Sequence, residues 1–185
     1  PEFTQIDIEM SFVDEEDIFS YMEGLTRHVF GNVAEIDLPN SFQRMTYRDA
    51  METYGSDKPD LRYELKLVDL KKFTDLSEFN AFNSVERVKG MVIKGGAKYS
   101  RKTIDDLTEL VKKYKAKGLA WMKSNNDGFE GGISKFFSTD LHEKIKSTLA
   151  IEDGDILFMI GDKSKVVLNA LGVLRSEIAA REDLI

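Results

Sequence analysis

Polar and apolar side chains alternate along the first twelve residues of the chain, PEFTQIDIEMSF. Successive side chains of a β-strand point to opposite faces, so a strand here would have one polar and one apolar face. The polar face would carry Gln5, Asp7 and Glu9, and the apolar face Ile6, Ile8, Met10 and Phe12. Periodicity alone favours the solvated edge of a half-buried sheet, so we expect the chain to begin with a strand.

The composition is that of an ordinary globular protein of one sizeable domain or two small ones, with 42% hydrophobic and 32% charged residues among 185. No apolar run approaches the length of about 20 residues that crosses a membrane, and no signal peptide is recognisable. The absence of cysteine excludes disulfides and thiolate metal sites. His28 and His142 lie far apart in the sequence, and we interpret each as a surface or packing residue of a helix.

Three aspartates near the C-terminal end raise the question of a metal site, namely Asp153, Asp155 and Asp162. Their spacing does not match a calcium-binding loop, so we interpret them as turn and cap residues and predict no metal site. No Ser-His-Asp or paired-carboxylate arrangement is recognisable, so the sequence predicts no catalytic residue.

Caps and apolar periodicity predict the secondary structure. A helix capped by Asp14 and ending near Gly31 should bury its apolar stripe, and a second helix should run from a Thr46 cap to a Gly55 stop. Polar Lys71–Glu78 is predicted to be a hinge. Further strands are expected at 65–70, 85–93, 119–123 and 155–161, and further helices from a Ser100 or Thr103 cap to Tyr114, at 139–149 and at 163–181. From residue 85 onward this order, with room for another short strand, predicts an α+β two-layer module with helices on one face of a largely antiparallel sheet.

The charge distribution supports two parts. Residues 1–75 hold 8 basic and 17 acidic side chains, whereas residues 76–185 hold 18 and 16. Within residues 85–123 the balance is 11 basic to 4 acidic, and such an excess attracts phosphate. The alternative is a lysine-rich solvated helix face. The candidate phosphate contacts are Lys98, Arg101, Lys102, Lys112, Lys113, Lys115 and Lys117.

Three long runs, in order, resemble one protein family. PEFTQIDIEMSF resembles the second strand of motif 2 in class II aminoacyl-tRNA synthetases, specifically the bacterial-type aspartyl-tRNA synthetase. FQRMTYRDAMETYGSDKPDLR and ELKLVDL are similar to the segment that follows motif 2. KGGAKYSRKTIDDL, YKAKGLAWMK and DGDILFMIGDKSKVVLNALGVLR resemble the insertion called the GAD domain, which two tRNA-dependent amidotransferase subunits share. The resemblance therefore predicts a partial catalytic domain in residues 1–75 and a GAD insertion domain in residues 76–185.

In that family, ATP and Mg²⁺ activate L-aspartate as an adenylate, and the aspartyl group passes to the 3′ end of tRNA-Asp. The resemblance implies a cytoplasmic homodimer with no membrane association. It places the substrate ammonium against Asp7, with Gln5 beside the substrate, because a carboxylate on a strand gives a short, charge-assisted hydrogen bond. Glu9 receives no role. In the family, the loop that corresponds to Ser56–Asp60 lies near the mouth of the active site, in reach of the acceptor end of tRNA, and the alternative for this loop is a plain connector.

The chain begins at Pro1 without an initiator methionine, so we expect a piece of a longer protein. It lacks the motif 2 arginine, motif 1, motif 3 and the anticodon-binding barrel of the family. We therefore expect the chain alone to be inactive and to bind no cofactor.

Two alternatives remain for the insertion, a non-catalytic tRNA-docking module and a purely structural spacer. Gly95–Gly96 is interpreted as a turn and Trp121 as a core residue.

Overall fold

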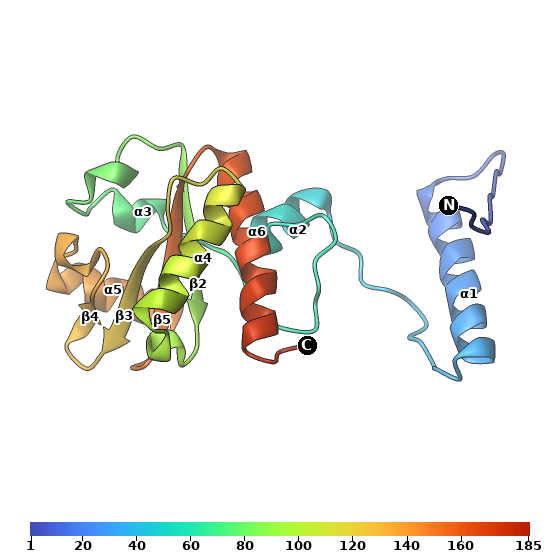
Figure 1. Cartoon of the computed structure of the whole chain (residues 1–185). Helices are drawn as coiled ribbons and strands as arrows, with labels where there is room; N and C mark the ends of the chain where they lie inside the picture. The colour runs from blue at the N-terminus through green and yellow to red at the C-terminus, as the bar shows by residue number, and fades with distance from the viewer. The chain divides into compact units, whose positions relative to one another are not determined.

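A computed structural model describes residues 1–185 and divides them into two compact units, Pro1–Met45 and Thr46–Ile185 (Figure 1). The helices are α1 (Glu15–Val33), α2 (Tyr47–Tyr54), α3 (Lys71–Thr74), α4 (Arg101–Lys113), α5 (Thr139–Leu149) and α6 (Ser164–Arg181). The strands are β1 (Val68–Asp69), β2 (Arg87–Ile93), β3 (Ala120–Asn125), β4 (Gly128–Glu130) and β5 (Ile156–Asp162). Short 3-10 turns are η1 (Asn80–Phe82), η2 (Gly96–Lys98) and η3 (Ser134–Phe136). None of the helices combines the length and the apolar character that a membrane span requires.

The first unit is built on α1, which begins at the predicted cap. The Asp14 carboxylate accepts the Asp17 N–H and the Asp17 carboxylate accepts the Asp14 N–H, each at 3.1 Å, which forms a capping box. The helix continues two residues beyond Gly31 to Val33. Residues 40–44 return along it, because Arg27 donates to the Asn40 carbonyl at 2.6 Å.

Two expectations for the first unit are wrong in this structure. Pro1–Phe12 has no regular secondary structure, because no other strand lies alongside it to complete its backbone hydrogen bonds. The apolar stripe of α1 is not buried either. Its members remain intermediate or exposed, namely Ile18, Tyr21, Met22, Leu25 and Val29. The alternating pattern of residues 1–12 and the helical pattern of α1 each predict an apolar face that is suited to burial. The first unit alone contains no other element large enough to cover these faces.

The second unit is built on a five-stranded sheet of order β1-β2-β5-β3-β4, in which every neighbouring pair is antiparallel. The two long central strands pair over their whole length, with Gly90 opposite Met159. β4 occupies the space that the sequence left for a further short strand, and the predicted strand at 65–70 shortens to Val68–Asp69. The α+β class with a largely antiparallel sheet is thus confirmed.

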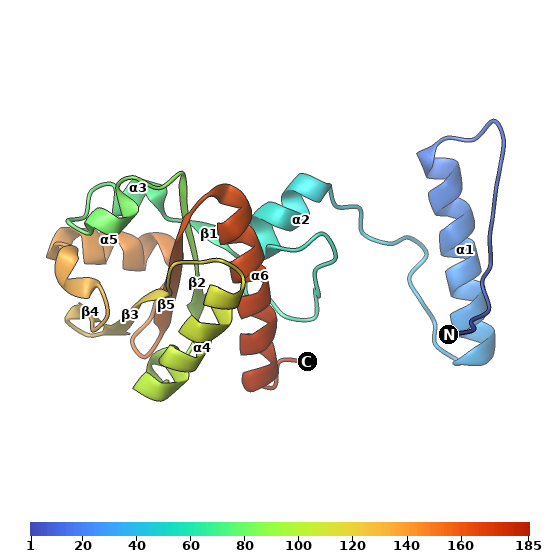
Figure 2. The same ribbon diagram turned by 45° about the horizontal axis from the view of Figure 1, so that its top comes forward.

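Helices cover both faces of this sheet, so the predicted two-layer arrangement is wrong (Figures 1 and 2). Along β5, Ile156, Phe158 and Ile160 pack with α4 and α6, whereas Leu157 and Met159 pack with α3 and α5. A strand that is apolar on both faces needs cover on both. The uninterrupted run ILFMI was the sequence signal for a third layer.

The segment before the sheet is attached to it rather than hinged. Gly55 ends α2 in the left-handed conformation (φ 70°) and lies directly against α6. A Cβ placed at Gly172 would lie 2.2 Å from the Gly55 carbonyl oxygen, so the two backbones touch where only glycine fits. Within the predicted hinge, Phe73 and Thr74 are buried, and the division between compact units falls at Met45 instead.

Buried cations secure the same attachment. Lys89 is 4% exposed and donates to the Glu52 carboxylate at 2.9 Å and to its carbonyl at 2.6 Å. Arg87 donates to the same carboxylate at 2.5 Å. The pKa of Glu52 is lowered because these hydrogen bonds and charges together outweigh partial burial, which is the largest single influence and raises it.

Arg175 of α6 is 2% exposed and has no carboxylate partner. Its guanidinium instead donates to three backbone carbonyls at 2.7–2.8 Å and lies 4.0 Å from the ring centre of Tyr63. The carbonyls belong to Asp60, Tyr63 and Leu65. One side chain therefore fixes the path of the loop that links α2 to β1.

Candidate nucleic-acid interface

The seven predicted phosphate contacts lie on α4 and its flanks, but they do not form one cluster. Ser100 caps the helix by accepting the Thr103 N–H at 3.1 Å, and Ile104, Leu107 and Val111 bury its apolar face as predicted. The basic residues divide between its two ends, which are separated by about 18 Å over 12 residues of helical rise.

At the first end, each basic residue has an acidic partner. Lys98 donates to Glu182 at 2.7 Å, Arg101 to Asp105 at 3.1 Å and Lys102 to Asp106 at 3.0 Å. The Lys98 hydrogen bond is the main cause that holds the pKa of the Glu182 carboxyl below its ordinary value. These side chains are locally neutralised, so this end of α4 offers little net charge to a phosphate.

The second end of α4 is different. Lys112 is paired with Glu109 at 2.8 Å, but Lys113, Lys115 and Lys117 are exposed and form no ion pair. Sequence reasoning missed two further lysines at the start of α6, Lys163 and Lys165, which are also exposed without an ion pair. The sequence feature that could have identified them is the triplet KSK, which directly follows the predicted strand at 155–161 and an aspartate.

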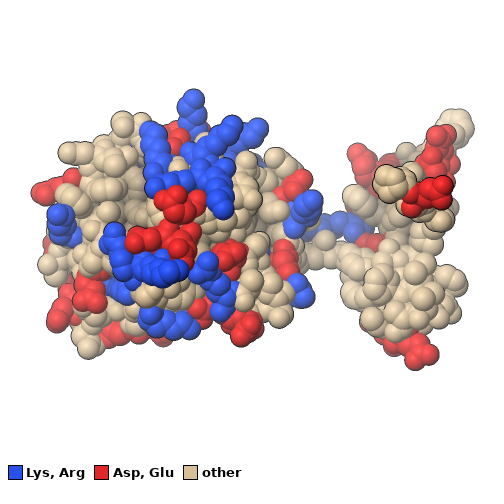
Figure 3. Space-filling model, viewed as in Figure 1, with Lys and Arg blue, Asp and Glu red and all other residues tan.

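The surface view agrees with this division. Basic atoms gather over the place where α4 ends and α6 begins, and again over the start of α4, with acidic atoms between them (Figure 3). Tyr114, expected in the buried stripe, is instead 43% exposed at the end of the helix. The second end is therefore the better candidate for contact with a polyanion.

Trp121 lies on β3, near Arg101 at the first end of α4, and partly confirms the expected core role. It packs against the core formed by α4 and α6 but stays only partly buried. Arg101 lies 6.0 Å and Lys123 5.9 Å from its ring centre, so two cations already occupy its surroundings.

Gln5 and Asp7, the predicted aspartate-binding residues, lie in the irregular segment before α1. Both are exposed, and neither forms a hydrogen bond or an ion pair within the chain. The structure therefore leaves both side chains available, and their predicted role stays a prediction.

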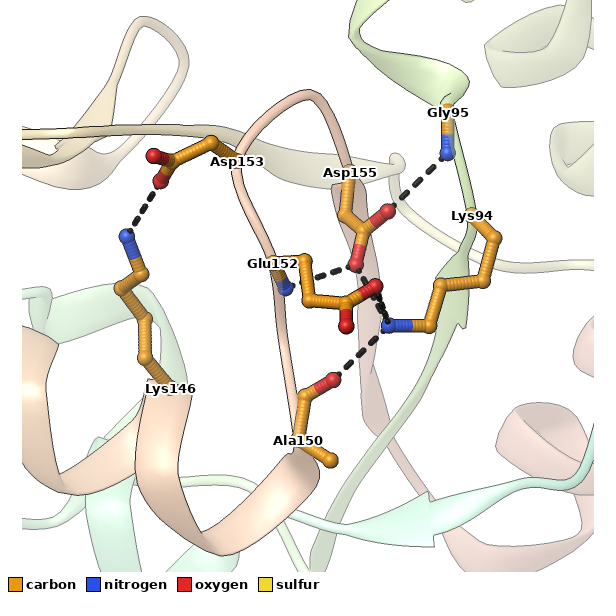
Figure 4. Close-up of polar contacts among 7 residues, drawn as sticks. All are labelled: Lys94, Gly95, Lys146, Ala150, Glu152, Asp153 and Asp155. Carbon is orange, nitrogen blue, oxygen red and sulfur yellow. Dashed lines mark hydrogen bonds and ion pairs between the residues drawn. The ribbon is translucent and has the colours of Figure 1, made fainter.

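The aspartates considered as metal ligands hold a turn together, as expected. Asp155 is 2% exposed and accepts the Gly95 N–H at 2.9 Å, the Glu152 N–H at 2.8 Å and the Lys94 ammonium at 3.0 Å (Figure 4). Burial, the largest influence, raises the pKa of Asp155, but the hydrogen bonds and Lys94 together lower it below its ordinary value. Asp153 pairs with Lys146 at 3.0 Å. Asp162 accepts the N–H of the next residue at 2.7 Å.

Each histidine has one of the two predicted roles, packing for His142 and a helix surface for His28. His142 of α5 accepts the Phe129 N–H through Nδ1 at 3.3 Å, and its Nε2 lies 3.1 Å from the Ser134 carbonyl oxygen. His28 is exposed on α1. Gly95 adopts a left-handed turn (φ 64°) before η2, so the predicted turn at the glycine pair is confirmed.

Comparison with known proteins adds the family. The model of the GAD domain matches residues 79–171, which run from the turn before η1 to the middle of α6. The chain belongs to the GAD domain family. The unpaired lysines at the second end of α4 and at the start of α6 all lie within the matched residues.

Aspartate–tRNA ligases match the chain over its whole length. The chain is 49% identical to an aspartate–tRNA(Asp/Asn) ligase of Persephonella marina and 46% identical to an aspartate–tRNA ligase of Staphylococcus saprophyticus. It is 44% identical to an aspartate–tRNA ligase of Clostridium perfringens. Each alignment covers 100% of this chain but 31–32% of the relative, so the chain spans about a third of the length of these proteins. The resemblance seen in the sequence is confirmed.

The segment that precedes the GAD domain in the sequence packs against it. Residues 46–78 precede the matched range, yet Glu52 and the loop bonded by Arg175 are fixed to the matched strands and to α6. The predicted division between residues 75 and 76 stays a prediction about the family domains. In space, the GAD domain and residues 46–78 form one compact unit.

Proposed function

We propose that this chain is part of an aspartate–tRNA ligase that uses ATP to activate L-aspartate and transfers it to the 3′ end of tRNA-Asp. The observation that carries the proposal is the alignment of the whole chain, at 44–49% identity, with ligases of that name. In this account residues 1–75 contribute to a class II catalytic domain and the remaining residues form its GAD insertion. The whole ligase is a homodimer.

Within this proposal, Asp7 binds the ammonium group of aspartate and Gln5 lies beside the substrate. A carboxylate supplies the charge-assisted hydrogen bonds that an ammonium requires, and the Asp7 side chain has no partner that would compete. The test is Asp7→Asn in a ligase of Staphylococcus saprophyticus whose aligned third is replaced by this chain. We expect KM for aspartate in ATP–pyrophosphate exchange to rise at least tenfold. Glu9→Gln is the matched control, and an equal effect of the two substitutions would remove the role of Asp7.

The chain brings together no three His, Asp or Glu side chains that could hold a metal ion. We therefore assign none of its residues to Mg²⁺. The motif 2 arginine and motif 3 of the family are not recognisable in the sequence, so we assign none to the triphosphate of ATP either. Without groups that hold the triphosphate, the chain alone should lack several kcal/mol of transition-state stabilisation. Purified chain is expected to show no ATP–pyrophosphate exchange above a heat-inactivated sample, and exchange above that level would contradict the proposal.

For the insertion itself, we propose tRNA docking rather than a purely structural role. The lysines without acidic partners at the second end of α4 favour it, because a local excess of positive charge attracts a polyanion such as tRNA. The test is a titration of the chain with labelled tRNA-Asp at low and moderate salt, followed by fluorescence anisotropy. We expect saturable binding that weakens with salt and weakens further when Lys112, Lys113 and Lys115 become alanine. No binding at tens of micromolar protein would support the spacer.

A further inference from the structure

An apolar groove of about 280 Å³ opens beside the second end of α4. Its walls come from η1, from the turn between α4 and β3, and from the end of β5. Phe79 forms one wall and is held by edge-on contact with Phe82 at 4.9 Å and by Phe136 at 5.3 Å. A groove of this size is slightly below the usual range for small-molecule sites, so it would accept a single ring system rather than a large ligand.

Unpaired lysines stand around this groove. Lys117 lines it directly, and Lys115 lies two residues before Lys117. Lys163 lies two residues after Gly161, which also lines the groove. Because one residue spans at most about 3.6 Å, each of these neighbours has its Cα within about 7 Å of a lining residue. Three ammonium groups are therefore within side-chain reach of the groove mouth.

Two carboxylates near the start of α6 are already engaged. Asp162 accepts the Lys163 N–H at 2.7 Å, and Glu86 accepts the Ser164 N–H at 3.2 Å. Neither forms an ion pair with a lysine of the groove. Both carboxylates keep their negative charge, and Glu78 lies next to Phe79, so these acids offset part of the positive charge near the groove. Lys115, Lys117 and Lys163 nevertheless form no ion pair, so their ammonium groups stay free to contact phosphate.

We propose that this groove binds one unpaired base of a single-stranded RNA segment, while Lys115, Lys117 and Lys163 contact the flanking phosphates. An aromatic wall beside cations is the combination that recognises a base and its backbone together. A duplex keeps its bases stacked inside and cannot place one in the groove. The inference rests on the proposed function, for which it names the part of the tRNA that is docked, namely unpaired nucleotides.

The test uses the intact chain and a fluorescein-labelled RNA of six unpaired nucleotides, with anisotropy measured at several salt concentrations. Ala81 is exposed and lines the groove, so Ala81→Phe should fill the groove without changing charge and weaken binding about tenfold. Lys117→Ala should weaken binding and reduce the slope of log affinity against log salt by about 0.7. Lys102→Ala is the matched control, since Lys102 is paired with Asp106 at the other end of α4, and it should leave binding within twofold.

Several results would overturn the proposal. These are absence of RNA binding at about 100 µM protein, equal affinity for a hairpin duplex, equal competition by a hexaglutamate peptide, or insensitivity to Ala81→Phe in a variant with unchanged thermal unfolding. An active chimeric ligase combined with no oligonucleotide binding would remove this site and leave the proposed function intact. Oligonucleotide binding combined with an inactive chimera would do the reverse.

Discussion

The contact between Gly55 and Gly172 gives the sharpest prediction about stability. Alanine at position 172 would place its Cβ 2.2 Å from the Gly55 carbonyl oxygen and 2.8 Å from the carbonyl carbon. Both distances lie well inside van der Waals contact, and the obstructing atoms are backbone. The end of α2 must therefore move away from α6, or α6 must bend.

Two opposing effects set the magnitude for Gly172→Ala. Replacing a mid-helix glycine by alanine favours the helix by about 1 kcal/mol. Overpacking of this kind costs about 1–3 kcal/mol, and a clash with backbone belongs at the upper end of that range. We expect a net loss of about 2 kcal/mol in the free energy of unfolding, or a decrease in Tm of about 4–8 °C for a unit of this size.

The assay combines thermal unfolding with amide hydrogen exchange. Exchange should accelerate most at Gly55 and Leu67, whose N–H groups donate to Met51 and Thr53, because these bonds hold the displaced segment. Gly24→Ala in α1 is the control, since a Cβ there meets nothing within 4 Å and only helix propensity should act. If Gly172→Ala raises Tm, as propensity alone requires, the reasoning from backbone contact is refuted.

Three further predictions concern buried charge. Arg175→Met leaves three carbonyls without a donor and should lower the free energy of unfolding by about 3 kcal/mol. Amide hydrogen exchange between residues 60 and 67 should become faster, and unchanged exchange there would contradict the anchoring role of Arg175. Glu52→Ala leaves buried Lys89 without its carboxylate and should lower the free energy of unfolding, measured in urea, by about 2 kcal/mol. This is less than the loss of about 3–5 kcal/mol for a fully buried ion pair, because Glu52 is 37% exposed. A loss below about 0.5 kcal/mol would exclude the pair as a stabilising contact. Because the folded-state pKa of Asp155 is lowered, its contribution is present above about pH 4 and is lost as pH falls through the folded value. Asp155→Asn should therefore lower stability at pH 7 and flatten its decrease in acid, and an unchanged acid profile would contradict this.

Local signals predicted most of the elements in the second unit. The caps Thr46 and Ser100, the Gly55 stop and the long helix after residue 163 are encoded by neighbours in sequence, so they could be predicted without the fold. The third layer was missed because a short apolar run does not show which elements cover its second face. The strand predicted at Pro1–Phe12 needs a neighbouring strand, and alternation alone cannot supply one.

The candidate interface divides in the same way. The excess of basic residues between residues 85 and 123 could be predicted from the sequence. Which of these lysines form ion pairs could not, because it depends on acidic residues that the fold brings close, such as Glu182 beside Lys98. Gly161, two residues before Lys163, lines the groove together with Lys117 only because β5 ends near the turn after α4. Arg175 was unremarkable in sequence, because its carbonyl partners lie 110–115 residues away.

The most direct test of the account is aspartylation of tRNA-Asp by the chimeric ligase in which this chain replaces the aligned third of the Staphylococcus saprophyticus enzyme. If the chain is the corresponding part of a ligase, the chimera should charge tRNA-Asp with kcat/KM within about tenfold of the parent, a difference of about 1.4 kcal/mol. A chimera that folds and assembles like the parent but does not aspartylate tRNA-Asp would contradict the central claim.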